Sequence, residues 1–199
     1  MKISRETLQT IVNYTKVSSK DETRPFLCSV ALRLINEDTL EITACSGYAA
    51  IKSEHKVTRT PMSDFVCDKY YLISLRNIKR IKIHLEDKDF NIFNLEVFVD
   101  RLTITGRNPL EINLIEREYP RIDSLWPDVK KAPENYEGNE ISFSPAKMTD
   151  IMKAIAPTKS LQNKIKGLNW ILFSKFSAMY CLKEFQGVDH KCVLMPCRM

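Results

Sequence analysis

A pattern that recurs three times restricts the fold of this chain more than any other feature of its sequence. Three segments carry apolar residues at helical spacing, and each is followed by segments with the composition of β-strands. We predict a unit made of a short strand, a helix and about three antiparallel strands. The units begin near residues 1, 64 and 140, and they share this pattern without recognisable sequence identity.

The three predicted helices cover residues 4–16, 68–81 and 144–155. Ser4 and Asp68 are candidate caps for the first two, because a short polar side chain can accept a hydrogen bond from the first free backbone N–H groups. The third begins with Ser144 followed by Pro145, a frequent combination at helix starts. Apolar side chains recur every three to four residues in each helix, which predicts one buried face.

The remaining periodic segments predict antiparallel strands. They cover residues 26–35, 39–57, 82–94, 95–106, 110–118, 167–176, 178–185 and 190–197, with short strands expected before the second and third helices at 65–68 and 139–144. Residues 127–139 are polar and contain proline, which indicates a linker. We therefore expect an α+β fold with a domain of two units at 1–126, the linker at 127–139, and a half-domain of one unit at 140–199.

The composition is that of a globular chain with a mild positive charge. Of the 199 residues 44% are apolar, which is enough for one or two cores. No run reaches the roughly 18 apolar residues of a membrane span, and the charged start of the chain predicts no signal peptide. We expect the six cysteines to be reduced thiols. The net charge of +5 permits a nucleic-acid partner without requiring one.

Basic residues gather on two of the predicted helices. The polar face of the first helix consists of Arg5, Gln9, Asn13 and Lys16, and that of the second carries Lys69, Arg76, Lys79 and Arg80. Such faces suit sequence-independent contacts with the phosphates of duplex DNA. For each helix the alternative is an ordinary solvated face. Neither helix carries a base-reading set of side chains, so we expect no sequence-specific binding.

Catalysis and metal binding have little support in the sequence. The three histidines, His55, His84 and His190, lie in separate strand or turn contexts. His190 and Cys192 fall on one side of a predicted strand, which would allow a thiol–imidazole pair or two metal ligands. No third ligand or orienting carboxylate accompanies them. We expect no enzymatic activity, no metal and no cofactor.

The chain ends in an apolar, sulfur-containing segment, Val-Leu-Met-Pro-Cys-Arg-Met at 193–199, where an exposed tail would be polar. From composition alone it is either the last core strand or one wall of a binding surface. The segment resembles the C-terminal ending of the bacterial DNA polymerase III beta sliding clamp family. Residues 23–50, with an Arg-x-x-Leu segment before a strand pair that contains Gly47, and residues 118–127, with a Tyr-Pro pair, resemble the family in the same order.

This resemblance covers nearly the whole chain and implies a DNA-clamp fold, with antiparallel sheets outside and helices on one face. It also implies an apolar pocket for short linear peptides of client proteins, with soft Met and Cys side chains that adapt to similar peptides. The implied pocket residues are Leu27, Cys45, Gly47, Tyr48, Ala50, Pro120, Leu125, Val193, Met195 and Cys197. The implied DNA-facing residues are Arg5, Lys16, Lys20, Arg24, Lys69, Arg76, Lys79 and Arg80.

The number of units has a consequence for assembly. Rings of this family close around duplex DNA with about twelve units, so three units in each chain would require a tetramer, in head-to-tail or dihedral order. The expected partners are double-stranded DNA, DNA polymerase, other proteins with clamp-binding motifs, and further copies of the chain. Alternatives are a decoy that binds client peptides or a host clamp without encircling DNA, and a plain interaction domain. The small size suggests a phage or mobile-element version in the bacterial cytoplasm.

Overall fold

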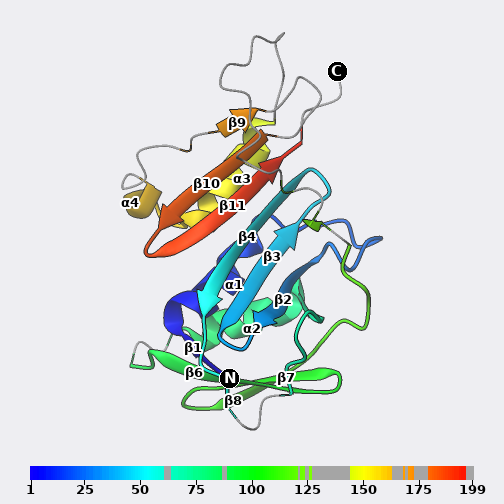
Figure 1. The fold of residues 1–199 in the computed structure, drawn as a ribbon, viewed down its shortest axis with the longest axis vertical. Coiled ribbons are helices and arrows are strands. Elements are labelled where there is room, and N and C mark those ends of the chain that lie inside the picture. Colours follow the sequence, from blue (N-terminus) through cyan, green and yellow to red (C-terminus); the bar gives the residue numbers. More distant parts are fainter. Residues whose placement is uncertain are drawn as a thin grey trace.

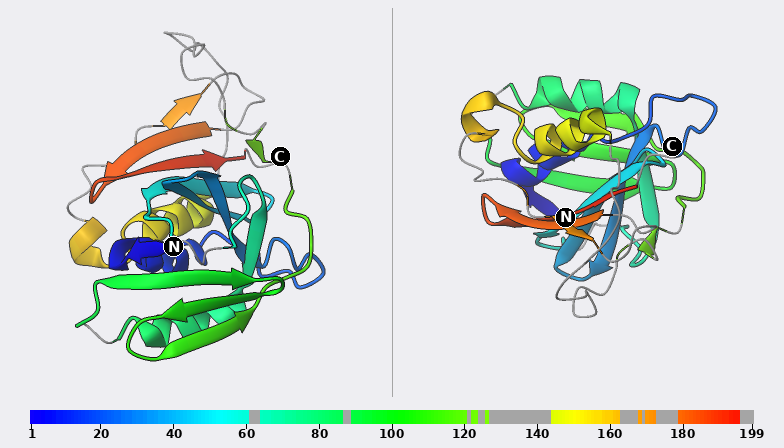
Figure 2. Two further views of the ribbon diagram at one scale, coloured as in Figure 1. Left: turned by 60° about the horizontal axis from the view of Figure 1, so that its bottom comes forward. Right: turned by 90° about the horizontal axis from the view of Figure 1, so that it is seen from above.

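The computed structural model describes residues 1–60, 64–86, 89–120, 122–123, 126, 144–162, 168, 170–172 and 179–195. It contains one sheet of seven strands and one of four, and every paired strand is antiparallel to its neighbour. Helices α1, α2 and α3 lie behind the larger sheet in Figure 1, and the smaller sheet lies below. The left view of Figure 2 shows α1 and α3 between the strands of the two sheets, with α2 at the bottom of that view. The predicted α+β architecture is therefore confirmed.

Each unit contributes one long helix and a set of strands. The first consists of β1 (Lys2–Ser4), α1 (Arg5–Tyr14), β2 (Ser29–Asn36), β3 (Thr39–Cys45) and β4 (Ala49–Lys56). The second consists of β5 (Tyr70–Ser74), α2 (Leu75–His84), β6 (Ile92–Phe98), β7 (Arg101–Thr105) and β8 (Pro109–Asn113). The described part of the third consists of α3 (Pro145–Ile155), α4 (Lys159–Gln162), β9 (Trp170–Leu172), β10 (Met179–Phe185) and β11 (Val188–Leu194).

The first two units exchange their first strands. Strand β1 of the first unit pairs with β6, and β5 of the second unit pairs with β2. The resulting strand orders are β1-β6-β7-β8 and β5-β2-β3-β4-β11-β10-β9. Because each sheet contains strands of both units, the two units form one body whose core runs between the sheets and the helices.

The third unit joins this body through its last strand. Strand β11 pairs with β4, with His190 opposite Ser53 and Leu194 opposite Ala49. The pairing continues one residue further, where the backbone N–H of Met195 donates to the carbonyl oxygen of Tyr48 at 2.8 Å. The larger sheet therefore runs without interruption from the second unit to the third.

Helix α1 occupies the centre of the helical layer, in contact with both α2 and α3. Ser4 caps it as predicted, with its hydroxyl accepting a hydrogen bond from the backbone N–H of Thr7 at 3.2 Å. Leu8, Ile11 and Tyr14 are fully buried on the face toward the sheet, as their helical spacing requires. Within the described residues, no helix combines the length and the apolarity of a membrane span.

The second helix begins later than the sequence predicts. Residues 70–74 form β5, and Ser74 caps α2 in place of Asp68, with its hydroxyl 3.2 Å from the backbone nitrogen of Asn77. The aromatic and apolar residues before Ser74 fit the spacing of a helix and also that of a strand. They form a strand because they pair with β2. The short strand predicted at 65–68 is therefore wrong, and so is the placement of Lys69 on the helix face, because Lys69 precedes β5.

Two further boundaries differ from the prediction. Helix α2 continues to His84 and takes the first residues of the segment predicted as a strand at 82–94. The segment predicted as a single strand at 95–106 is divided by a tight turn at Val99, whose φ is 49°. Three strands, β6, β7 and β8, follow α2 as predicted. Only their boundaries differ from the predicted ones.

The start of the third helix agrees with the sequence prediction. The hydroxyl of Ser144 accepts a hydrogen bond from the backbone N–H of Lys147 at 3.4 Å, and Pro145 occupies the first turn of α3. The predicted linker at 127–139 lies outside the described residues. The same is true of residues 139–143 from the strand predicted before α3, and of most of the strand predicted at 167–176.

Candidate functional site

An apolar pocket lies where the turn between β3 and β4, the end of β11 and the segment after β8 meet. Its volume is about 290 Å³. The lining residues are Phe26, Leu27, Cys45, Gly47, Tyr48, Ala49, Ala50, Pro120, Ile122, Val193 and Met195. They come from four separate parts of the sequence, so the pocket exists only where the third unit is joined to the first.

The β3–β4 turn forms one rim of the pocket. Gly47 has a φ of 87°, a conformation that favours glycine, and this turns the chain so that Tyr48 projects outward. Tyr48 is 68% exposed and Met195 is 38% exposed, although both are large and apolar. Their backbone hydrogen bond holds these two rim residues side by side. Exposed apolar side chains beside an apolar cavity are typical of a site that a partner covers.

The opposite wall belongs to a segment that we call the connector, residues 114–126, of which 121, 124 and 125 are not described. The backbone N–H of Ile115 donates to the carbonyl oxygen of Leu72 at 2.9 Å, which fixes the start of the connector on β5. Tyr119 and Ile122 are then buried against Leu27, which precedes β2, and against apolar residues of the sheet. This packing brings the neighbouring Pro120 into the pocket wall.

Among the lining residues that the structure describes, the pocket has no Asp, Glu, Lys or Arg side chain. Cys45 is buried and accepts a hydrogen bond from the backbone N–H of Gly47, with its Sγ 3.3 Å from that nitrogen. Burial raises the pKa of the Cys45 thiol, which therefore stays neutral at physiological pH. A cavity of this kind binds an uncharged apolar group and disfavours a charged one, because a charge would lose its hydration without gaining a partner.

The pocket brings together residues that the sequence analysis singled out. Those among the lining residues are Leu27, Cys45, Gly47, Tyr48, Ala50, Pro120, Val193 and Met195. Leu125 and Cys197 lie outside the described residues. Phe26, Ala49 and Ile122 also line the pocket and were not predicted, although each is close in sequence to a predicted residue.

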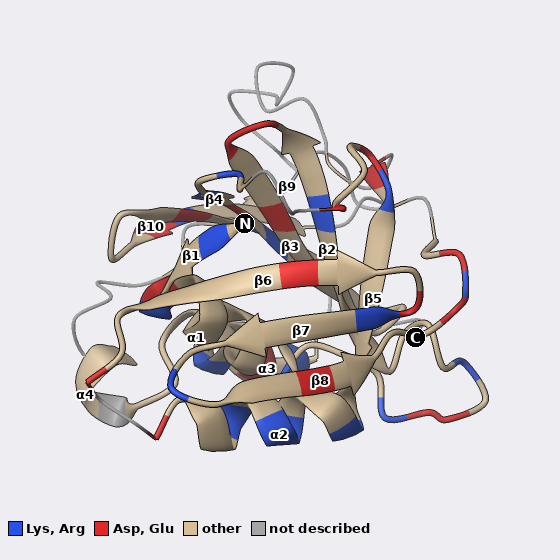
Figure 3. Ribbon diagram, turned by 90° about the horizontal axis from the view of Figure 1, so that it is seen from below, with Lys and Arg blue, Asp and Glu red and all other residues tan. Residues whose placement is uncertain are grey.

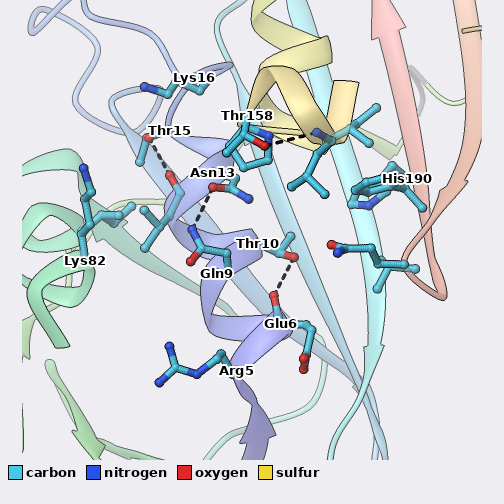
Figure 4. A pocket seen from close by; sticks show the side chains of 18 of the residues that line it. Arg5, Glu6, Gln9, Thr10, Asn13, Thr15, Lys16, Lys82, Thr158 and His190 are labelled. Carbon is cyan, nitrogen blue, oxygen red and sulfur yellow. Dashed lines mark hydrogen bonds between the residues drawn. The ribbon is translucent and has the colours of Figure 1, made fainter. Parts of the chain in front are cut away.

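The helices border a second concave surface, the helix groove, with a volume of about 890 Å³. Arg5 and Lys16 of the α1 region and Lys79 and Lys82 of α2 line its basic side. Figure 4 shows α1 at the centre of this groove, with Lys82 on one side and Thr158 and His190 on the other. Lys82 is the basic lining residue that the prediction omitted.

Other predicted DNA-facing residues have different surroundings. Arg76 and Arg80 are exposed on α2 without lining the groove, and Figure 3 shows basic residues along the outer side of that helix. Lys20 and Arg24 are exposed on the loop between α1 and β2. The guanidinium of Arg5 donates to the carbonyl oxygens of Phe90 and Leu85, both at 2.8 Å, so it holds the protein's own backbone.

Two of the three histidines, His55 and His190, belong to the protein interior. His190 Nδ1 lies 2.9 Å from the hydroxyl of Tyr14, and His55 lies between Ser53 and Thr7, with ring nitrogens 2.9 Å and 3.3 Å from their hydroxyls. Cys192, the possible partner of His190, is fully buried. Among the described residues, no group of His, Cys, Asp or Glu side chains is arranged to hold a metal ion.

Solved structures with the same architecture are bacterial replication proteins. The DNA polymerase III beta subunit of Thermotoga maritima superposes with a TM-score of 0.74 at 12% identity, over 100% of this chain and 65% of its own. The chain has the sliding-clamp fold. The DNA polymerase III beta chain of Streptococcus pneumoniae superposes with a TM-score of 0.69 at 14% identity, over 100% of this chain and 64% of its own. The sliding clamp of Bartonella birtlesii bound to griselimycin superposes with a TM-score of 0.70 at 11% identity, over 100% of this chain and 66% of its own.

Sequence comparison adds no relative to these structures. No protein-family model matches the chain, and no curated protein matches it. The chain spans 65% of the length of the Thermotoga maritima clamp.

Proposed function

We propose that this protein acts by binding, as a clamp-like processivity factor that tethers client proteins to duplex DNA through the apolar pocket. The observation that carries the proposal is the convergence of the β3–β4 turn, the connector and the end of β11 on one cavity whose described lining residues are apolar, beside two exposed apolar residues. The sliding-clamp fold of the chain supports this reading. A phage origin stays a prediction from the resemblance.

The size and chemistry of the pocket fit one or two apolar side chains of a short peptide. Burial of a leucine or phenylalanine side chain contributes about 1.5–3 kcal/mol. Two such anchors contribute about 3–6 kcal/mol together, which by itself corresponds to a Kd of about 0.04–6 mM. The entropy lost on binding weakens this affinity further. A tether of this strength would hold a client that is also bound to DNA and release it easily.

Peptide binding is tested by fluorescence anisotropy with a labelled, uncharged peptide that carries leucine and phenylalanine side chains. Met195→Glu places a carboxylate at the rim, and we expect the Kd to rise about tenfold or more. Leu182→Glu is the matched control, because Leu182 is also apolar and 49% exposed but is not a lining residue. Equal affinity of both variants for the peptide would exclude the pocket as the binding site.

We also propose that the helical side faces DNA. The exposed basic residues of α2 support this, because no acidic residue lies on that helix and diffuse positive charge allows sliding without fixed contacts. The double variant Arg76→Glu/Arg80→Glu should shorten the retention of the protein on nicked circular DNA. The control Lys2→Glu/Lys56→Glu reverses two exposed lysines on strands and has the same net charge, +5 − 4 = +1. Equal retention of the two variants would contradict the assignment.

Assembly into a ring is part of the same proposal. The three units of the chain support a homo-oligomer, with four chains as the simplest closed ring. Light scattering on the purified protein should give a mass well above the 23.1 kDa of one chain. A monomer at micromolar concentration that binds the peptide would favour the decoy function, since the pocket does not depend on encircling DNA.

A further inference from the structure

The outer face of the larger sheet carries a row of charged side chains beside the apolar pocket. We call Arg33, Glu41 and Lys52, on β2, β3 and β4, the charge row. Arg33 Nη2 lies 2.9 Å from Glu41 Oε1, and Lys52 Nζ lies 3.2 Å from Glu41 Oε2. The Glu41 side chain is only 2% exposed, so its charge depends on both partners. Two cations around one carboxylate leave the row with one positive charge in excess.

The connector supplies the second carboxylate. Asp123 accepts a hydrogen bond from each terminal nitrogen of the Arg33 guanidinium, both at 3.2 Å, while Arg33 Nε donates to Glu41 at 3.0 Å. Arg33 therefore uses its fork to hold the sheet and the connector together. The ring of Trp126 lies 5.0 Å from Lys52 Nζ, a distance at which a cation is attracted to the ring face.

These contacts lie on the same segment as the pocket wall. Pro120 and Ile122 line the pocket, and Asp123 follows directly in the sequence. Arg33, Glu41 and Lys52 do not line it. The pocket wall therefore continues directly into residues that contact charges outside the cavity, and Tyr119 and Ile122 are buried beside it.

We propose that Arg33 is a positioning residue for client binding, because its ion pair with Asp123 holds the connector on the charge row and so completes the pocket. The inference rests on the proposed function for its biological meaning, while the seating of the connector can be measured without any client. When the connector leaves the sheet, Pro120 and Ile122 leave the pocket with it, and a client loses one wall of its site. Ionic strength then controls client affinity even though the described residues that line the pocket carry no charge.

The test uses Asp123→Asn, which removes one charge from a side chain that is 54% exposed, with Asp123→Glu as the conservative variant. Trp126 reports on the seat of the connector, and Trp170→Phe removes the other tryptophan. In Asp123→Asn we expect acrylamide quenching of Trp126 to increase about twofold and the Kd for the labelled apolar peptide to rise about two- to fivefold. Asp123→Glu should restore both values toward those of the wild type.

The control is Asp38→Asn, which breaks the exposed Lys56–Asp38 pair elsewhere on the sheet and should change neither value. Salt provides a second measurement that needs no variant: raising NaCl should increase Trp126 quenching in the wild type and leave Asp123→Asn nearly unchanged. Quenching that is the same in wild type and Asp123→Asn, at low and high salt, would overturn the proposal. A wild type that binds no peptide would refute the proposed function, and the quenching result would still decide the role of Arg33.

Discussion

Acid should loosen the junction between the first and third units, because two buried histidines lie there in neutral form. His190 of β11 bonds to Tyr14 of α1, and His55 of β4 bonds to Ser53 and Thr7. Both imidazoles are 4% exposed. Burial lowers the pKa of each to about 4, against 6.5 for a free histidine, and for His190 the nearby His55 adds to the effect.

The sign of the effect follows from proton linkage. The folded-state pKa is depressed, so between pH 6.5 and pH 4 the unfolded chain binds protons that the folded chain excludes. Stability is therefore full above pH 6.5 and falls as the pH is lowered. From pH 7.5 to pH 5 each histidine reduces the free energy of unfolding by about 2 kcal/mol, and the two together by about 4 kcal/mol.

Urea unfolding at pH 7.5 and pH 5, followed by circular dichroism, measures this loss. The interval avoids most carboxylate titration, since ordinary carboxyl groups have pKa values of about 4. The variants His55→Gln and His190→Gln should each remove about half of the pH dependence, whatever they cost at pH 7.5. A wild type whose free energy of unfolding changes by less than about 1 kcal/mol between the two pH values would refute the reasoning.

Three local features give further predictions, each measured by urea unfolding at pH 7.5. Ser74→Ala removes the cap of α2 and should cost about 1 kcal/mol, and no loss would show that the cap is dispensable. Val99→Asn should stabilise by about 1 kcal/mol, because Val99 is 90% exposed with a φ of 49°, and destabilisation would contradict strain there. Gly47→Ala should cost about 1 kcal/mol, because alanine is strained at the φ of 87° that Gly47 adopts. The added Cβ would make an ordinary contact with Leu27 at 3.9 Å and no clash, so the cost comes from the backbone alone. A neutral result would refute the backbone argument.

The sequence predicts helix starts well where the cap is the only local option. Ser4 and the Ser144–Pro145 pair mark α1 and α3 correctly. The start of α2 could not be predicted in the same way, because β5 has apolar residues at positions that suit a helix or a strand. Only its pairing with β2, about 40 residues away in sequence, decides between the two.

The candidate site shows the same division between local and long-range information. The turn at Gly47 and the apolar end of the chain are visible in the sequence, and the resemblance to clamps associates them with Pro120. The exchange of β1 and β5 between the two sheets and the contact of Arg33 with Asp123 depend on pairs of residues far apart in sequence. A single sequence does not encode such pairs in any readable pattern, so Ile122 and the charge row become visible only in the folded chain.

The methyl NMR signal of Met195 provides the most direct test of the central claim that clients bind where β4, β11 and the connector meet. The protein is labelled at its methionine methyl groups, the Met195 signal is assigned with Met195→Leu, and the apolar peptide is added. We predict a saturable shift of the Met195 signal, with the signals of Met148 and Met152 on α3 unchanged. Saturable peptide binding that leaves the Met195 signal in place would contradict the account.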